Sequence, residues 1–491
     1  MFALSLLRPH FIKECRSKAK TMDVLDTGNM TGILSSLPPE WRPTTQSESP
    51  GPMLAHHKAP MIILDDDPTG TQTVHNVPVL TTWDVDVLSR ILSSKEPVTY
   101  LSANSRALTT EEAREQFDEI MHNLVLAMQQ TGTNCDIIIR SDSTLRGHFP
   151  LDVERVQLGL RQAGQVQDVH VLLVPAFPGG GRYTVNGIQW VRQGNQLLPV
   201  AETPYALDTT FGFKNSDIRQ WVEEKSGKKI HAEDVGLLDI QTIRLGGPEK
   251  VAHFLHHAPA FTVVDVASDA DLAVLVQGLL LAGSAEKRFL VRSAASFVRV
   301  WSGIGERTLL TREEIGVKAG AGLVIVGSHV STTTRQVERL LAETAITTLP
   351  VDVHQILQEP QKVVASLAAE INASLAANKS VMVMTTRDVV TAHSADESLR
   401  ISREISHHLS AIIASLAETP AFIIAKGGIT SADIASKGLG LRRGYVLGQI
   451  VPGVSVWRID EADHFHHIPF IVFPGNVGDD ETLLAVYRAL L

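Results

Sequence analysis

Short apolar segments that end abruptly in polar or glycine-rich residues recur along the chain from residue 61 onward. These segments are continuously apolar and rich in Val and Ile, rather than alternating between apolar and polar positions. Such runs are typical of strands that are buried on both faces, as in parallel sheets covered by helices. The strands predicted on this pattern are 61–64, 98–101, 136–140, 169–174, 261–266, 322–326, 381–384, 422–425 and 470–473.

The intervals between these strands are long enough for helices, which we predict at 111–130, 335–343, 362–377 and 402–416. The predicted fold class is therefore α/β, with two open, largely parallel-sheet domains that face a cleft. We expect the domains to span 59–266 and 321–491, with 267–320 as a less regular connecting region. In open α/β sheets ligands bind beyond the carboxyl ends of the strands, so the loops after the strands are the candidate site.

The first 58 residues differ in composition from the rest of the chain. Residues 1–20 combine Arg and Lys with a single acid, Glu14, as mitochondrial transit peptides and frayed tails both do. Residues 22–58 are rich in Ser, Pro, Thr and Gly, which is typical of linkers. We therefore expect 1–58 to be a disordered or targeting extension. The expected location is cytoplasmic, with mitochondrial import as the alternative.

Composition and charge exclude several classes of protein. A chain of 491 residues that is 44% hydrophobic can bury the cores of two or three domains. The net charge of -10 disfavours nucleic acid as a partner, and two cysteines exclude a disulfide scaffold and a four-cysteine zinc site. The most apolar run, 272–282, is too short to span a membrane and predicts a buried helix. The composition leaves the oligomeric state open, and a homodimer is compatible with it.

Three consecutive carboxylates, Asp65, Asp66 and Asp67, follow the strand at 61–64. They repel one another unless a cation or hydrogen-bond donors lie nearby. At a strand end such a group can hold Mg2+, accept a proton from a hydroxyl, or bind the hydroxyls of a polar substrate. Asp, Pro, Thr and Gly also favour turns and helix caps, which is the alternative role of this loop.

A second loop, at the end of the strand 136–140, combines arginines with an acid and hydroxyls. Its polar members are Arg140, Ser141, Asp142, Ser143, Thr144 and Arg146. Guanidinium groups bind carboxylates in a bidentate manner, and Arg106, at the end of another strand, can join them. The pattern suits an anionic, hydroxylated substrate such as a sugar acid. The alternative is a turn held together by pairs of aspartate and arginine.

Three loops in the second domain combine glycine with hydroxyl or amide side chains. They contain Gly327 and Ser328, then Gly427, Gly428, Ile429 and Thr430, and finally Gly475 and Asn476. Glycine lets backbone N–H groups approach phosphates. Each loop alone could be an ordinary turn, but three at strand ends of one domain favour a nucleotide site. The sequence contains no GxxxxGK[ST], GxGxxG or GxSxG motif, so P-loop, Rossmann dinucleotide and α/β-hydrolase sites lack support.

Taken in order, these loops resemble the four-carbon acid sugar kinase family over residues 61–485. DDxTG occurs at 66–70, DSTLRG at 142–147, and PAFP…GR…NG at 175–187. GS…T..Q occurs at 327–336, GGxTS at 427–431 and GNxG at 475–478. The combination of DSTLRG with a downstream GGxTS is specific. Two departures concern the site: Arg140 stands where the family usually has lysine, and Ile429 replaces the acid of GGETS.

The resemblance implies a two-domain, ATP-dependent kinase that phosphorylates the terminal hydroxyl of a sugar acid such as 3-oxo-tetronate, threonate or erythronate. The first domain would bind the acid through Asp66, Arg106 and the loop 140–146. The second would bind ATP through Ser328, Gly427 to Thr430, Gly475 and Asn476. Mg2+ and arginines, Arg146 in particular, would offset phosphate charge, while Asp66 or Asp67 accepts or orients the hydroxyl proton. No residue is assigned as a metal ligand.

Two other functions are compatible with parts of the sequence. The segment MIILDDDPTGT also fits the haloacid dehalogenase phosphatase signature, with Asp65 as nucleophile and Asp67 as acid/base. Ile429 in the nucleotide loop motivates the second alternative, a non-catalytic pseudokinase that senses a nucleotide or metabolite.

Overall fold

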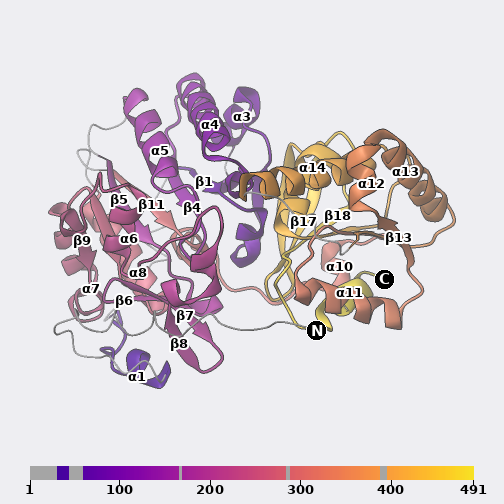
Figure 1. Ribbon diagram of the computed structural model, residues 1–491. Helices are drawn as coiled ribbons and strands as arrows, with labels where there is room; N and C mark the ends of the chain where they lie inside the picture. Colours follow the sequence, from indigo (N-terminus) through magenta and orange to yellow (C-terminus); the bar gives the residue numbers. More distant parts are fainter. Residues whose placement is uncertain (1–29, 44–58, 95, 165–168, 284–287, 387–394) are drawn as a thin grey trace, which may run out of the picture.

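The computed structural model describes residues 30–43, 59–94, 96–164, 169–283, 288–386 and 395–491. Two lobes lie side by side, each built from strands with helices packed around them (Figure 1). Within the described residues, fifteen strands form one continuous sheet that runs through both lobes, and three more form a small separate sheet. The predicted α/β class is therefore confirmed, but the two expected main sheets are joined into one.

The first half of the sheet contains only parallel neighbours. Its spatial order is β2 (Val77–Leu80), β3 (Val98–Ser102), β1 (Met61–Asp65), β4 (Asp136–Arg140), β11 (Arg288–Ser293), β5 (Val169–Val174), β10 (Phe261–Val264) and β9 (Val235–Leu238). The small antiparallel sheet, β6 (Arg182–Val185), β7 (Ile188–Gln193) and β8 (Gln196–Pro199), belongs to the same half of the chain.

The second half adds five parallel strands and an antiparallel pair. The parallel strands are β13 (Thr347–Val351), β14 (Val381–Thr385), β12 (Leu323–Val326), β15 (Ile423–Lys426) and β18 (Pro469–Phe473). Next to β18 lie β17 (Val454–Glu461) and β16 (Arg443–Val451), and β16 pairs antiparallel with β2. This last pairing makes the sheet continuous between the two halves.

Helices cover both faces of the sheet, as continuously apolar strands require. One face of the first half carries α3 (Val85–Ser93), α4 (Thr110–Thr131), α5 (Leu151–Gln162) and α6 (Ile218–Lys225). One hydrophobic core on the opposite face spans both halves, beneath α7 (Ile240–His256), α8 (Asp269–Ala282), α9 (Ala295–Trp301), α12 (Val353–Gln358), α13 (Pro360–Ala376) and α14 (Ala395–Ala414). The remaining face of the second half packs against α11 (Ser331–Glu343) and α16 (Thr482–Leu490).

Most of residues 267–320, expected to connect the domains, packs in the core of the first half, whereas Leu310 and Ile315 pack in that of the second half. The helix α8 contains the predicted buried run, and β11 pairs with both β4 and β5. The strand escaped prediction because Arg288 and Arg292 interrupt its apolar sequence. Across the described residues, no helix is long and apolar enough to cross a membrane.

Part of the N-terminal extension is also folded onto the first half. The helix α1 (Met30–Ser35) is followed by Leu37, which packs with Ile33 and Leu34 against the small sheet. The Arg244 guanidinium donates to the carbonyl oxygen of Pro38 at 2.8 Å. Within the extension 1–58, expected to be disordered or a targeting segment, residues 30–38 are thus folded against the first half. The expectations for 1–29 and 44–58 lie outside the described residues.

Candidate active site

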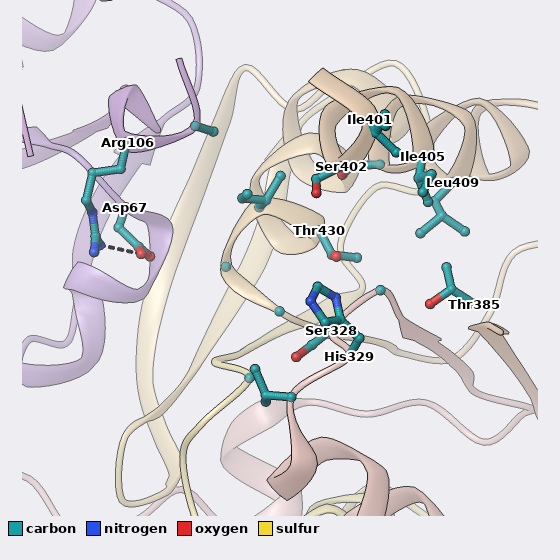
Figure 2. Close-up of a pocket in the computed structure, with 18 of the residues that line it drawn as sticks. Asp67, Arg106, Ser328, His329, Thr385, Ile401, Ser402, Ile405, Leu409 and Thr430 are labelled. Carbon is teal, nitrogen blue, oxygen red and sulfur yellow. Dashed lines mark hydrogen bonds and ion pairs between the residues drawn. The ribbon is translucent and has the colours of Figure 1, made fainter. Parts of the chain in front are cut away.

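A cleft of about 730 Å3 lies between the two halves. Most of its walls come from the loops that follow the carboxyl ends of β1, β3, β4, β12, β14, β15 and β18, and from one face of α14. Figure 2 shows residues of the first half on one side of the cleft, Asp67 and Arg106, and residues of the second half facing them, among them Ser328, His329 and Thr430. The cleft thus lies where ligands bind in α/β sheets.

The first of the three consecutive aspartates does not reach the cleft. Asp65 is completely buried, and its Oδ1 accepts a hydrogen bond from Arg140 Nη1 at 3.1 Å. Gly70 packs directly on the Asp65 carboxylate, where a Cβ would overlap it. Burial raises the pKa of Asp65 to about 7, although Arg140 acts in the opposite direction. A nucleophile must face its substrate, so this position contradicts the phosphatase alternative.

Asp66 and Asp67 differ in their access to the cleft. Asp66 is buried, with carboxylate oxygens 3.2 Å from Arg106 Nε and 3.3 Å from Arg140 Nη1. Burial raises the pKa of Asp66 despite these two cations. Asp67 lines the cleft and caps the short helix η2 (Pro68–Thr73), because its Oδ1 accepts from the Thr69 N–H at 2.7 Å.

The Asp67 carboxylate is held as an anion beside the second half of the chain. Its other oxygen pairs with the Arg106 guanidinium (Figure 2). Burial raises the pKa of Asp67, but Arg106 and Arg140 outweigh it, so the pKa lies below its ordinary value. A Cβ added to Gly428 would lie 3.4 Å from Asp67 Oδ2. Asp67 is therefore an ionised carboxylate beside a glycine loop of the other half.

Among the described residues, two arginines line the cleft, and both are already paired with carboxylates of the protein. Arg106 lies in the short helix η3 (Ser105–Ala107) and forms ion pairs with Asp66 and Asp67. Arg146 Nε donates to Asp142 Oδ2 at 2.7 Å, and its Nη1 lies 3.7 Å from Asp208 Oδ2. The Arg146 guanidinium also lies over the Tyr205 ring, 5.1 Å from the ring centroid. A substrate carboxylate would thus meet two guanidinium groups that are fixed in position.

The other predicted residues of the loop after β4 support these arginines without lining the cleft. They are Arg140, Ser141, Asp142, Ser143 and Thr144. Arg140 is buried against Asp65 and Asp66, and the Thr144 hydroxyl donates to Asp142. The carbonyl oxygen of Ser143 accepts from Gln189 Nε2 at 2.7 Å. The alternative interpretation, a turn held by pairs of aspartate and arginine, describes this part of the loop.

All the predicted nucleotide-binding residues line the second half of the cleft: Ser328, Gly427, Gly428, Ile429, Thr430, Gly475 and Asn476. Glycine is required where the loops approach one another. Gly427 has a φ of 125°, and a Cβ on Gly475 would lie 2.5 Å from Ser328 Oγ. The Thr333 hydroxyl on α11 donates to the Gly475 carbonyl oxygen at 2.8 Å. The GS…T..Q motif therefore holds the loops after β12 and β18 together.

Several lining residues were not predicted from the sequence. Ile401, Ile405 and Leu409 of α14 form an apolar wall beside Thr385 (Figure 2). Their spacing of four residues marks one face of a helix, but it does not reveal what that face meets. Asp208 and Phe211 come from an irregular loop after η6 (Pro204–Leu207), and no pattern in the sequence distinguishes them. His329 lines the cleft beside Ser328.

The described residues of the cleft offer a carboxylate to a metal ion but no complete set of ligands. In the part of the chain that the structure describes, no three His, Cys, Asp or Glu side chains come together in a way that could hold a metal ion. Protein-bound Mg2+ often takes only one or two carboxylates, with phosphates and waters as its other ligands. Asp67, ionised and beside a glycine loop, fits that requirement.

Comparisons with known proteins agree with the division of the cleft. Residues 61–301 match the model of a sugar-binding N-terminal domain, and residues 323–483 match that of a nucleotide-binding C-terminal domain. The first match includes β11 and α9, in accord with their place in the first half of the sheet. No curated protein matches the chain significantly.

Two solved structures share the fold. A Salmonella typhimurium LT2 protein, provisionally named a tRNA synthase, is 18% identical with a TM-score of 0.64, over 89% of this chain and 100% of its own. A Haemophilus influenzae protein of the domain family DUF1537 is also 18% identical, with a TM-score of 0.59, over 88% of this chain and 100% of its own. At this identity the likeness concerns the fold alone.

Proposed function

Because the chain belongs to the four-carbon acid sugar kinase family, we propose that it transfers the γ-phosphate of ATP to a terminal hydroxyl of a small sugar acid. Candidate acids have about four carbons, such as 3-oxo-tetronate, threonate and erythronate. The observation that carries the proposal is the meeting of Asp67, from the sugar-binding half, with Gly428, from the nucleotide-binding half, in one cleft.

The second half of the cleft suits ATP in two respects. The glycine loops after β12, β15 and β18 expose backbone to the cleft, and backbone N–H groups bind phosphates. The apolar wall of Ile401, Ile405 and Leu409 can bury the faces of a nucleobase. Ile429 lacks the carboxylate found in the family's GGETS, so it would contribute only its backbone and an apolar side chain.

The first half suits a small carboxylate with hydroxyls. Arg106 and Arg146 present guanidinium groups to the cleft, and these bind carboxylates through paired hydrogen bonds. Asp208 lies next to Arg146. It would either accept a hydrogen bond from a substrate hydroxyl or be replaced by the substrate carboxylate as a partner of Arg146. Such a charged and hydroxylated surface matches a sugar acid better than a neutral sugar.

The chemistry requires alignment and charge neutralisation more than a strong base, because phosphoryl transfer passes through a loose transition state. Asp67, whose pKa lies below its ordinary value, would accept a hydrogen bond from the acceptor hydroxyl and orient its oxygen. Mg2+, when bound with ATP, would neutralise phosphate charge, and Asp67 is the side chain that would hold it. Arg106 keeps Asp67 in place, and Arg146 would fix the acid.

The proposal is tested by coupling ADP formation to a recorded signal in the presence of Mg2+, over a panel of sugar acids. The panel contains threonates, erythronates, their 3-oxo forms and five-carbon acids. Turnover on one of them supports the kinase and identifies its substrate. ATP binding without turnover on any of them favours the pseudokinase that Ile429 motivates. Absence of ATP binding contradicts the assignment of 323–483.

A further inference from the structure

A lysine lies completely buried immediately before the glycine loop that follows β15. Lys426 is the last residue of β15 and has no exposed surface. Its Nζ donates to the carbonyl oxygens of Pro474 at 2.7 Å and Gly475 at 3.3 Å, and it lies 3.8 Å from the centroid of the Phe473 ring. Lysine is rarely buried to this degree unless a carboxylate neutralises it.

Within the part of the chain that the structure describes, no such carboxylate accompanies Lys426. Among the described residues its neighbours are carbonyl oxygens and an aromatic ring, and no acid forms an ion pair with it. In accord with this, burial alone lowers the pKa of Lys426 to about 7. The charge of a protonated Lys426 is therefore not cancelled locally, and its effect extends to whatever occupies the adjacent cleft.

Hydrogen bonding to the loop does not by itself require a lysine. The carbonyl oxygen of Gly475 already accepts a hydrogen bond from the neutral Thr333 hydroxyl, at 2.8 Å. A fully buried ammonium group is costly where neutral donors would serve. What Lys426 adds is a positive charge against the carbonyl oxygen of Gly475, which lines the cleft with Asn476. Lys426 also directly precedes the lining segment Gly427 to Thr430.

We infer that Lys426 is a positioning residue of the nucleotide site. It holds the loop after β18 against the loop after β15, and its uncompensated charge attracts the phosphates that bind on the other side of that backbone. The inference rests on the proposed binding of ATP in this half of the cleft. It predicts that Lys426 matters more for a ligand with more phosphates.

The test compares adenosine, AMP, ADP and ATP as ligands of the full chain in titration calorimetry. Lys426→Met removes the charge and both donors, whereas Lys426→Gln removes the charge and keeps a donor. Thr333→Val is the matched control, because it removes a neutral donor to the same carbonyl oxygen. Thermal unfolding and adenosine binding show which variants are folded, and Lys426→Gln serves alone if the methionine variant does not fold.

We expect Lys426→Gln to bind adenosine within twofold of the wild type and to bind ADP and ATP at least tenfold more weakly. Lys426→Met also loses both hydrogen bonds to the loop after β18, so it should in addition weaken adenosine to about the extent that Thr333→Val does. Thr333→Val should weaken all four ligands to a similar extent. Equal losses for adenosine and ATP in the Lys426 variants would overturn the electrostatic role, and unchanged ATP affinity would overturn the inference altogether. If the wild type binds neither adenosine nor ATP, the proposed function itself fails.

Discussion

Asp67→Asn is the substitution that most directly examines the proposed chemistry. It preserves the shape of the side chain while removing the charge that faces the cleft. Both carboxylate oxygens are occupied on the protein side, one by the Thr69 N–H and the other by Arg106. An asparagine must turn its NH2 group toward one of these two donors, so one of the two hydrogen bonds is lost.

The expected magnitude follows from these contacts. Loss of a hydrogen bond to a charged group costs about 1.5–3 kcal/mol. Removal of a group that orients or deprotonates a reacting hydroxyl lowers the rate by roughly 10²–10⁴-fold. The two effects overlap, since both act through the position of one oxygen. We therefore expect kcat to fall by about 10²–10⁴-fold, and ATP affinity measured without Mg2+ to change by less than about threefold.

The assay is steady-state ADP formation with the best sugar acid, and Asp66→Asn is the control. Asp66 is buried between Arg106 and Arg140, and removing one partner of a buried ion pair costs about 3–5 kcal/mol of stability. We expect the isosteric Asp66→Asn to lower the unfolding temperature, with kcat within about tenfold of the wild type. A kcat of Asp67→Asn within threefold of the wild type would refute the role assigned to Asp67.

Three further predictions address other parts of the site. Arg146→Ala should raise the KM for the sugar acid about 10- to 100-fold, because a hydrogen bond to a charged group is lost. The Kd of ATP should stay within twofold of the wild type, and an equal loss of ATP binding would contradict the division of the cleft. Gly427→Ala should weaken ADP binding about tenfold in calorimetry, because φ is 125° there, whereas unaltered affinity would show that the loop relaxes freely. Asp65 has a pKa of about 7 in the folded protein and an ordinary pKa of about 4 in the unfolded chain. Between pH 4 and 7 its carboxyl group is therefore protonated in the folded protein and ionised in the unfolded chain. The unfolding free energy should therefore fall as pH rises through that window, by at most about 4 kcal/mol, and Asp65→Asn should flatten this trend in thermal unfolding; identical slopes would contradict it.

The sequence predicted the parallel strands well because burial on both faces leaves a continuous apolar run. It did not predict strands whose sequences are not continuous apolar runs. β2 is only four residues long and contains Pro78, and β16 alternates between buried and partly exposed residues. These two strands form the junction between the halves, so the single continuous sheet could not be predicted from apolar runs.

The candidate site was predictable as a set of loops but not as individual side chains. Asp66 and Asp67 are chemically identical neighbours, and their difference arises from the turn of the chain into η2, which Asp67 caps. Arg140 ends β4 and Arg146 lies in the loop that follows, yet of these two only Arg146 reaches the cleft. Lys426 ends an apolar run like any polar residue at a strand end, and only its burial against the next loop distinguishes it.

The pairing of β2 with β16 limits how independent the two halves can be. Four residue pairs join these strands, from Arg443 with Leu80 to Val446 with Val77, and Trp457 Nε1 donates across the junction to Thr71 Oγ1 at 3.0 Å. A fragment containing either half alone would present a bare strand edge, which is a template for aggregation. A chimera that combines one half of this chain with the other half of a related protein would fold only if its β2 and β16 paired in the same register. The junction thus makes the folding of the two ligand-binding halves interdependent.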